Sequence, residues 1–457
     1  MIINNMNSIK KFYFFEKIFK IIFSLDNKLM FTSVQPLMYP AKTSYKNILI
    51  NTFFFLSNLN IKDFIKTLIL LIFFLFIDIL KILYLPIIIF FYFSKYRFVQ
   101  LQYNQIGAST QHLNIMVKKN FIDGYKSIIL MPSTTEFSFF SEIFENLIIV
   151  NNLFLNVLLM PLKHTNFISC TTKKVEHHLN SNLKLVHSSP FSKITNRFKK
   201  KNKEKTKNIF KFKDKYVKEN YNYFKKKYPH VDLKKTIIIH HRERNYKKTS
   251  HLRGSLISTY KPSIRYLLSK GFVVIRLIHS RSTKLFFKNK KYIEINMEEL
   301  VNKKLQFLIL KKCKGFIATD SGPNSIGSLL DMPVYNTNVY GINVNAINKS
   351  GVYILKKIKR LNKTLTYKEL IDLGYYKGFC YSRRYAEKIG LSPIDNSAEE
   401  ILLGLKEFIK LNNKYKPNKK QINFKNSLPD YIELKHYDSN ISNAFIKKNE
   451  TLFKELI

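Results

Sequence analysis

The chain has 457 residues, of which 46% are hydrophobic and 24% charged, and its 77 basic against 31 acidic side chains give a formal net charge of +46. This length is enough for two or three domains, and the apolar fraction excludes wholesale disorder. The positive charge favours anionic partners, namely nucleotide phosphates, anionic lipid or nucleic acid. Lys, Ile, Asn, Phe and Tyr are all abundant, as in proteins of AT-rich genomes. Part of the lysine content therefore reflects genome composition, and the net charge alone does not choose among these partners.

The chain has three cysteines, Cys170, Cys313 and Cys380. They lie far apart and no histidine cluster accompanies them, so the pattern is neither that of a disulfide framework nor that of a zinc site. We expect them to be reduced thiols in a cytoplasmic compartment.

An apolar stretch covers residues 67–93 and is interrupted by Asp78, Lys81 and Pro86. It begins too late for a secretory signal and lacks a small-residue cleavage site. As a single span it would place both charges near the middle of a bilayer, at a cost of roughly 2.5–3.5 kcal/mol each. Each half is too short to cross alone, because a crossing needs about 20 apolar residues. A monotopic or re-entrant anchor is favoured, and a true span or a buried hairpin remain alternatives.

Basic residues on both sides of this stretch favour a hairpin on an anionic leaflet over a crossing. They are Lys62, Lys66, Lys95 and Arg97. We therefore expect residues 1–97 to form a membrane-associating region.

A first α/β unit is predicted after the apolar stretch. Residues 127–132 and 154–161 have the composition of short buried strands, and residues 139–147 between them that of a helix, which favours parallel pairing. A lysine-rich stretch at 197–218 is most simply a solvated linker, with a nucleic-acid-binding or lipid-binding tract as the alternative. Residues 98–234 are therefore predicted to form an N-terminal Rossmann-like acceptor domain with a basic linker.

The C-terminal half alternates between strand and helix patterns, which predicts a doubly wound parallel sheet with right-handed crossovers. The expected strands are 236–240, 272–277, 315–320 and 333–336. The expected helices are 259–270, closed by Gly271, then 302–312 and 323–331. Residues 235–411 are predicted to form a C-terminal Rossmann-like donor domain, and residues 412–457 a basic tail, either loose or a late helix.

Three polar clusters follow strands of this predicted sheet, at 240–246, 276–282 and 319–325. Ligands of open α/β sheets bind outside the carboxyl ends of the strands, so we expect these clusters to meet at one edge. In the third cluster a strand ends, Ser321 and Gly322 make a tight turn, and Pro323 suits the first helical position. Backbone amides at such a turn, with a helix N-terminus behind them, can bind a diphosphate. An ordinary capped helix start is the alternative.

The residues of this turn that are expected to bind phosphate or sugar are Thr319, Asp320, Ser321, Gly322, Pro323, Asn324 and Ser325. Arg242 and Arg276 each lie at a strand end, and a guanidinium can grip a phosphate through two hydrogen bonds. Glu243 and His241 are the candidates for the catalytic base. A surface arginine, a glutamate neutralised by arginines and a core histidine are the corresponding alternatives.

Several metal and phosphate motifs are absent from the sequence. It contains no Asp-x-Asp, no P-loop, no Gly-x-Gly-x-x-Gly after a strand and no His-Glu-x-x-His. We therefore expect chemistry without a metal or other cofactor, in which arginine and helix dipoles take the place of Mg²⁺.

The motifs shared with a known family are His240-x-Arg242, Arg253 with Thr259-Tyr260, Gly-Phe-Val-Val-Ile-Arg at 271–276, Asp-Ser-Gly-Pro at 320–323 and Pro-Val-Tyr-Asn-Thr-Asn at 333–338. In these the chain resembles an uncharacterised family of bacterial glycosyltransferases found with surface-polysaccharide genes. The His-x-Arg and Asp-Ser-Gly elements are also similar to fucosyltransferase-like enzymes of the GT-B fold, in which such an arginine holds the donor diphosphate. Gly254 and His279 depart from the pattern, which bears on donor identity more than on fold.

The resemblance implies two Rossmann-like domains of the GT-B type and sugar transfer, with inversion, from a nucleotide sugar to a membrane-linked glycan or lipid acceptor. It places such an enzyme on the cytoplasmic face of the inner membrane, as a peripheral or monotopic protein. Two other hypotheses are a membrane-surface binding protein with a vestigial pocket and a basic nucleic-acid-binding protein. Nucleic acid is the least favoured partner, because no common RNA-binding motif occurs.

Overall fold

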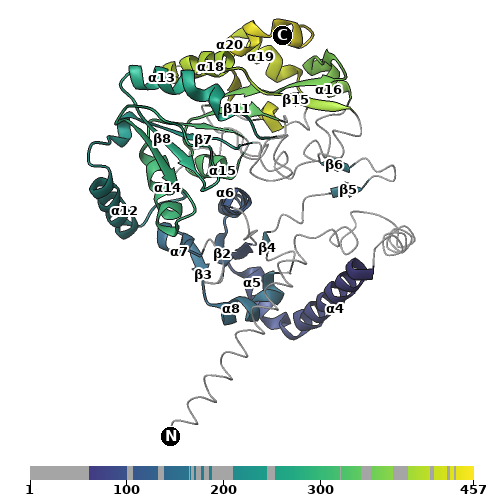
Figure 1. The fold of residues 1–457 in the computed structure, drawn as a ribbon. Coiled ribbons are helices and arrows are strands. Elements are labelled where there is room, and N and C mark those ends of the chain that lie inside the picture. The colour runs from purple at the N-terminus through teal and green to yellow at the C-terminus, as the bar shows by residue number, and fades with distance from the viewer. Residues whose placement is uncertain are drawn as a thin grey trace. The chain divides into compact units, whose positions relative to one another are not determined.

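The structure is a computed structural model in which the chain divides into two compact units, Met1–Asn182 and Leu183–Ile457. Figure 1 shows the chain coloured by residue number. The structure describes residues 61–99, 106–131, 138–163, 165, 169–170, 177–179, 185–187, 209–243, 253–319, 321–340, 351–373, 390–411, 416–429, 433–436 and 439–457.

The first unit contains a four-stranded parallel sheet in the order β3-β2-β1-β4. Its strands are β1 (Tyr96–Val99), β2 (Lys126–Leu130), β3 (Ile148–Val150) and β4 (Ser169–Cys170). The described helices are α4 (Ile61–Leu83), α5 (Leu85–Phe93), α6 (Ile106–Ile122), α7 (Phe140–Ile143), α8 (Leu153–Leu158) and α9 (Met160–Lys163), and a further short strand is β5 (His177–Leu179). The strand expected at 127–132 is confirmed as β2.

The strand expected at 154–161 is wrong, because this segment forms α8 and α9. The side chain of Asn152 caps α8 by accepting a hydrogen bond from Leu155 N at 3.0 Å. Buried Asn156 donates to Val150 O at 2.7 Å and so holds the helix against the end of β3. A short apolar run is compatible with either a strand or a helix. Here the hydrogen bond that the Asn152 side chain accepts at the helix N-terminus favours the helix.

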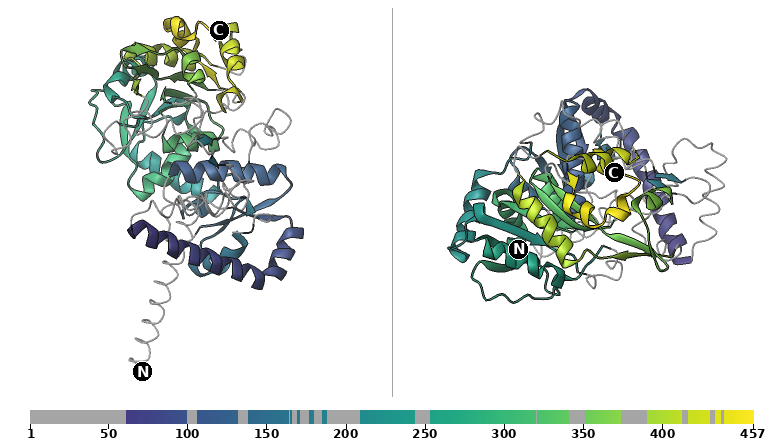
Figure 2. Two further views of the ribbon diagram at one scale, coloured as in Figure 1. Left: turned by 90° about the vertical axis from the view of Figure 1, so that its right-hand side faces the viewer. Right: turned by 90° about the horizontal axis from the view of Figure 1, so that it is seen from above.

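No single helix among the described residues is apolar over a length that could cross a membrane. The segments Leu75–Leu83 and Leu85–Phe93 meet that criterion only together, and they are bent by 74° at the break between them. Figure 2 shows α4, in purple, continuing into α5 at an angle. The bend falls just before Pro86, whose ring cannot continue the hydrogen bonding of a straight helix.

The second unit is built on a seven-stranded sheet in the order β16-β12-β11-β10-β7-β8-β9, and every described pair in it is parallel. Its strands are β7 (Thr236–His240), β8 (Val273–Ile278), β9 (Tyr292–Asn296), β10 (Gly315–Ala318), β11 (Val334–Val339), β12 (Val352–Leu355) and β16 (Asn440–Ile441). The chain is thus mixed α/β with a large parallel sheet, as the alternation in its C-terminal half predicts.

The order of strands reverses direction at β7. From β7 the chain adds β8 and β9 on one side, then crosses to the other side to add β10, β11 and β12. In open α/β sheets such a reversal leaves a crevice between the carboxyl ends of the two strands concerned, here β7 and β10. This topology therefore defines the place where a ligand site is expected.

Helices cover both faces of this sheet, as Figure 1 shows. One face carries α13 (Lys261–Ser269) and α18 (Ala398–Lys410), and the other α12 (Asp214–Lys227), α14 (Leu300–Lys312) and α15 (Gly322–Leu329). Gly271 ends the turn after α13 with a φ of 81°, a conformation that glycine adopts without strain. The helices expected at 259–270, 302–312 and 323–331 are thereby confirmed, with shifted ends.

The segment 412–457, expected as a basic tail, contributes packed structure where it is described. Its elements are α19 (Lys419–Ser427), η5 (Glu433–His436), β16, α20 (Asn443–Lys448) and α21 (Glu450–Phe453). Phe424, Phe445 and Phe453 are buried in the core of the unit, and β16 pairs with β12. The lysine-rich composition of this segment suggested a solvated tail. A few apolar residues spaced along short helices are nevertheless sufficient to bury one face of each helix.

The second unit contains further short elements besides the seven-stranded sheet and the helices on its faces. A small antiparallel sheet, in the order β14-β13-β15, is formed by β13 (Lys357–Arg360), β14 (Lys363–Thr364) and β15 (Leu391–Ile394). The short helices are η3 (Leu233–Lys235), η4 (Ile257–Tyr260) and α16 (Tyr367–Asp372), and a further strand is β6 (Leu185–His187).

Candidate functional site

The carboxyl ends of β7 and β10 are tied together by the residues that follow them. Thr319 N donates to His240 O at 3.2 Å, and Arg242 N donates to Thr319 Oγ1 at 2.9 Å. Thr319 is fully buried, whereas Arg242 is half-buried. The first and third polar clusters of the sequence therefore meet where the strand order reverses.

Ser321 begins α15 as its N-cap residue, with an extended backbone at φ −147°. Its hydroxyl makes no capping bond; it lies 2.8 Å from His240 Nδ1 and donates to Thr319 O at 3.2 Å. Because a hydroxyl has one proton, this geometry is satisfied when Nδ1 of His240 is the donor to Ser321. Ser321 therefore gives the first turn of α15 no side-chain cap, and the amides at an uncapped helix N-terminus attract anions.

Burial dominates the electrostatics of His240, whose side chain is 4% exposed. It holds the pKa of His240 well below its ordinary value, and the nearby His279, His241, Arg242 and Arg276 act in the same direction. His240 Nε2 is buried and makes no hydrogen bond. The ring is therefore neutral near pH 7 and adds no positive charge to the site.

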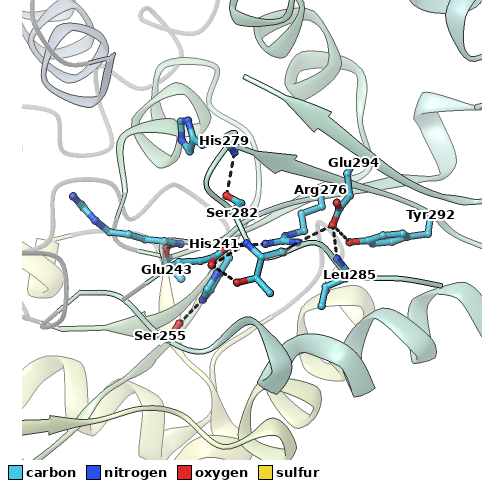
Figure 3. A network of polar contacts seen from close by, with 12 residues as sticks. His241, Glu243, Ser255, Arg276, His279, Ser282, Leu285, Tyr292 and Glu294 are labelled. Atoms are coloured by element: carbon cyan, nitrogen blue, oxygen red, sulfur yellow. Dashed lines mark hydrogen bonds and ion pairs between the residues drawn. The ribbon is translucent and has the colours of Figure 1, made fainter. Parts of the chain in front are cut away.

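Arg276, on β8, is buried at 1% exposure and lies at the centre of a polar network, which Figure 3 shows. Its Nη2 donates to Glu243 at 3.0 Å, and its Nη1 donates to Glu294 at 2.7 Å and to the carbonyl of Thr283 at 2.6 Å. One guanidinium thus joins the segment after β7, the loop after β8 and strand β9. The sequence predicts that Arg276 holds a diphosphate, whereas this geometry favours a positioning role.

Both carboxylates of this network also bind the loop at 279–285. Glu243 accepts from Thr283 N at 2.9 Å and from Thr283 Oγ1 at 2.7 Å. Glu294 accepts from Leu285 N at 3.2 Å and from the hydroxyl of Tyr292 at 2.7 Å. Charge-assisted bonds therefore hold the loop at Thr283 and Leu285, in its second half.

His241 lies on the other side of the same segment and is also buried. Its Nε2 lies 2.9 Å from Ser255 Oγ, and its ring packs edge-on against Tyr260 at 5.0 Å. Burial, and then the charge of Arg276, lower the pKa of His241 from 6.5 to about 3. A general base works best with a pKa near the working pH, so this environment does not favour His241 in that role.

A second polar layer lies next to this network and joins residues of two sequence motifs, Thr259-Tyr260 and the segment 333–338. The Tyr260 hydroxyl lies 2.6 Å from Thr337 Oγ1 and accepts from Asn338 Nδ2 at 3.2 Å. Asn338 has a positive φ of 52° and exchanges backbone–side-chain bonds with Asn396 at 2.6 and 2.8 Å. Buried Lys356 donates to Gly254 O and pairs with Asp395.

The structure therefore brings together most of the residues expected in the site. Arg242, Thr319 and Ser321 lie at the β7–β10 crevice, whereas Glu243 and Arg276 pair with each other beside it. Gly322 and buried Pro323 form the first turn of α15. Asn324, also in that helix, donates to Asn336 of β11 at 2.5 Å, and Ser325 is buried. Asp320 lies outside the described residues.

The sequence indicates the centre of this site but not the partners that hold it. Glu294, Tyr292 and Lys356 lie on strands or strand ends that carried no recognised motif. An acidic residue in the apolar alternation of β9 was the available signal for Glu294. Among the residues that the structure describes, no three His, Cys, Asp or Glu side chains are placed to hold a metal ion.

Two solved structures are similar to this chain at low identity. One is a family 9 glycosyl transferase from Veillonella parvula, with 10% identity and a TM-score of 0.39, covering 69% of this chain and 96% of its own. The other is the E. coli ADP-heptose LPS heptosyltransferase II, with 9% identity and a TM-score of 0.35, covering 69% of this chain and 98% of its own. The chain matches no protein-family model and no curated protein.

Proposed function

We propose that this chain is a glycosyltransferase that binds the diphosphate of a nucleotide-sugar donor in the crevice between β7 and β10. The observation that carries the proposal is the uncapped N-terminus of α15 beside Arg242, at the point where the strand order reverses. Helix amides and a guanidinium together can bind a diphosphate and stabilise it as a leaving group without a metal ion. The sequence resemblance to bacterial glycosyltransferases agrees with this chemistry.

In this proposal Arg242 and the first turn of α15 contact the phosphates. Arg276 acts one step away, since Glu243 and Glu294 engage its guanidinium and it fixes the loop at 279–285. Glu243 is held by Arg276 and Thr283, so its first role is also to position that loop. Catalysis by Glu243 or His241, and contact of Asp320 with the donor, stay predictions from the sequence.

The acceptor is proposed to be a membrane-linked glycan or lipid, and the sugar transfer an inverting one at the cytoplasmic face of the inner membrane. The support for this acceptor is the apolar α4–α5 segment in the same chain and the resemblance to surface-polysaccharide enzymes. The nucleotide and the sugar are determined by the following experiment.

Binding of nucleoside diphosphates and nucleotide sugars to the full chain is measured by calorimetry and thermal shift, with EDTA present. We expect one nucleotide class to bind, and Arg242→Ala to weaken it by about 10- to 100-fold, because a charge-assisted phosphate contact is lost. Arg265→Ala, which removes an exposed arginine on α13, is the matched control and should bind as the parent does.

Unchanged affinity in Arg242→Ala would exclude the proposed donor site. Activity is then followed by release of the nucleoside diphosphate from the bound nucleotide sugar, with lipid extract as acceptor. Donor binding without turnover would point to the vestigial-pocket hypothesis. If no nucleotide or nucleotide sugar binds, the proposed function itself is contradicted.

A further inference from the structure

The outer face of α4 is apolar and exposed. The exposed residues recur at intervals of three and four, which places them on one side of a helix. They are Ile65, Ile69, Ile72, Phe76, Ile79 and Leu83, with exposed fractions from 47% to 71%. The buried residues Phe73 and Ile77 face the protein instead. A surface helix in water normally shows the reverse pattern, with polar side chains outside.

Helix α5 extends this apolar surface. Its sequence, LPIIIFFYF, contains no charged residue, and of its side chains only Ile88 is buried. Phe90 and Phe93 are 67% and 80% exposed. Ile88 packs with Phe98, Leu130 and Leu162, so one side of α5 is fixed to the sheet of the first unit while the other sides are open.

A buried arginine fixes the end of α5. Arg97 Nη1 donates to Phe91 O at 2.9 Å and to Ser94 O at 3.1 Å, and Nη2 donates to Tyr92 O at 3.3 Å. Its guanidinium lies 3.7 Å from the centre of the Tyr125 ring. The carbonyls at the end of an apolar helix, which would be costly to leave unbonded in lipid, are thus satisfied by the protein.

The charges of this region suit a lipid surface. Asp78 and Lys81 pair within α4 and so neutralise each other. Lys95, just after α5, is exposed, and the chain as a whole carries a formal charge of +46. An apolar surface with basic residues at its margin matches the interface of an anionic membrane.

From these observations we propose that α4 and α5 form a bent anchor that lies in one leaflet of a bilayer without crossing it. Nine residues of α5 extend about 14 Å, roughly half of the hydrocarbon thickness of about 30 Å. The 74° bend turns the two apolar helices away from a single straight span. This proposal is independent of the donor site and of the proposed sugar transfer.

The first test measures partition of the full chain onto vesicles of phosphatidylcholine with and without phosphatidylglycerol, by flotation. We expect binding to both, tighter with the anionic lipid, and at least about tenfold weaker binding for Phe90→Glu/Phe93→Glu. The matched control is Phe286→Glu/Leu361→Glu, which places the same charges at two exposed apolar positions of the second unit, 91% and 81% exposed. It should bind as the parent does, and circular dichroism should show that both variants fold.

Equal partition of the parent and Phe90→Glu/Phe93→Glu, or no binding of the parent to either vesicle, would overturn the proposal. A dimer in light scattering that Phe90→Glu/Phe93→Glu dissociates, without vesicle binding, would assign the face to a second copy of the chain. If the chain neither binds vesicles nor forms such a dimer, the apolar face of α4 and α5 is covered by other residues of this chain, and the proposal is overturned.

The second test distinguishes an anchor that stays in one leaflet from a helix pair that crosses the bilayer. Single cysteines, Lys62→Cys and Lys95→Cys, are introduced on a cysteine-free background, and the protein is added to preformed vesicles. Both should react with a membrane-impermeant thiol reagent, because the two ends of the helix pair lie on the same side. Protection of one of them, relieved by detergent, would show a crossing and overturn the one-leaflet geometry.

Discussion

Arg276 illustrates how one buried charge organises the site. It sits on β8, next to the edge strand β9, and its two carboxylate partners are 33 and 18 positions away in the sequence. A buried ion pair adds little net stability compared with apolar residues of the same size. Removing one partner is costly, however, because the remaining charges stay buried without compensation.

Arg276→Ala is expected to lower the free energy of unfolding by about 3–5 kcal/mol, since Glu243 and Glu294 lose their shared cation. Urea titration followed by circular dichroism measures this change. Arg265→Ala on α13, an exposed arginine, should change it by less than about 0.5 kcal/mol. Equal effects of the two substitutions would contradict the central role of Arg276.

His241 gives the second prediction at this scale. Its pKa is about 3 in the folded chain and ordinarily 6.5, so between these values the unfolded state binds more protons. Stability from this group is complete above pH 6.5 and is lost as the pH falls toward 3, by up to about 1.4 kcal/mol per pH unit. His241→Gln should therefore flatten the fall in unfolding free energy between pH 6.5 and 5. His230→Gln, at an exposed position, should keep the parent slope; a parent-like slope in His241→Gln would exclude the buried neutral ring.

At the scale of elements, the contact between α18 and the sheet depends on a residue without a side chain. Gly404 of α18 faces Tyr335 of β11, and a Cβ atom built on it would lie 2.3 Å from the Tyr335 hydroxyl. That hydroxyl donates to Ile401 O in the same helix at 3.0 Å. Helix propensity alone would favour alanine over glycine by about 1 kcal/mol, so the glycine reflects packing.

Gly404→Ala is expected to destabilise the chain by about 1–3 kcal/mol, because the overpacked contact outweighs the gain in propensity. Thermal and urea unfolding measure the change. Tyr335→Phe in the same chain should recover part of the loss by removing the clashing oxygen. Lys410→Ala, on an exposed position of α18, is the control. A stabilising Gly404→Ala would show that α18 lies farther from β11.

The helices and strands of the chain were predicted with unequal success for a physical reason. Strands β7, β8 and β10 are buried on both faces and appear as continuous apolar runs. The run at 154–161 looks the same but forms α8 and α9, because Asn152 and Asn156 supply helix-specific hydrogen bonds. Strand β9 is an edge strand with a weak pattern and was missed.

At the scale of the whole molecule, the proposed phosphate site lies within one of the two units. All residues that carry the proposed phosphate site belong to the unit Leu183–Ile457. Three segments of that unit meet at the sheet edge, near 240–243, 279–285 and 319–325. Binding of a diphosphate there should be visible as a local effect on the backbone.

Hydrogen exchange of the full chain, with and without the nucleotide that binds, tests this location. We expect the largest slowing in peptides covering these three segments, because bound phosphates occupy amides at the start of α15. The result should be the same in EDTA and in Mg²⁺, within about twofold in affinity, if arginine and helix amides hold the charge. Protection confined to other segments, or binding that requires Mg²⁺, would contradict the site.

The sequence by itself determined the alternation of strands and helices in the C-terminal half and the three polar clusters that follow strands. It could do so because burial patterns are local and parallel strands present their carboxyl ends at one edge. Only the tertiary structure decided which residues at that edge of the sheet pair with one another and which are buried. It paired Arg276 with Glu243 and Glu294, buried His241, joined Tyr260 to Thr337 across 77 residues and brought β16 to β12. Such contacts depend on how distant segments pack, and no local pattern encodes their partners.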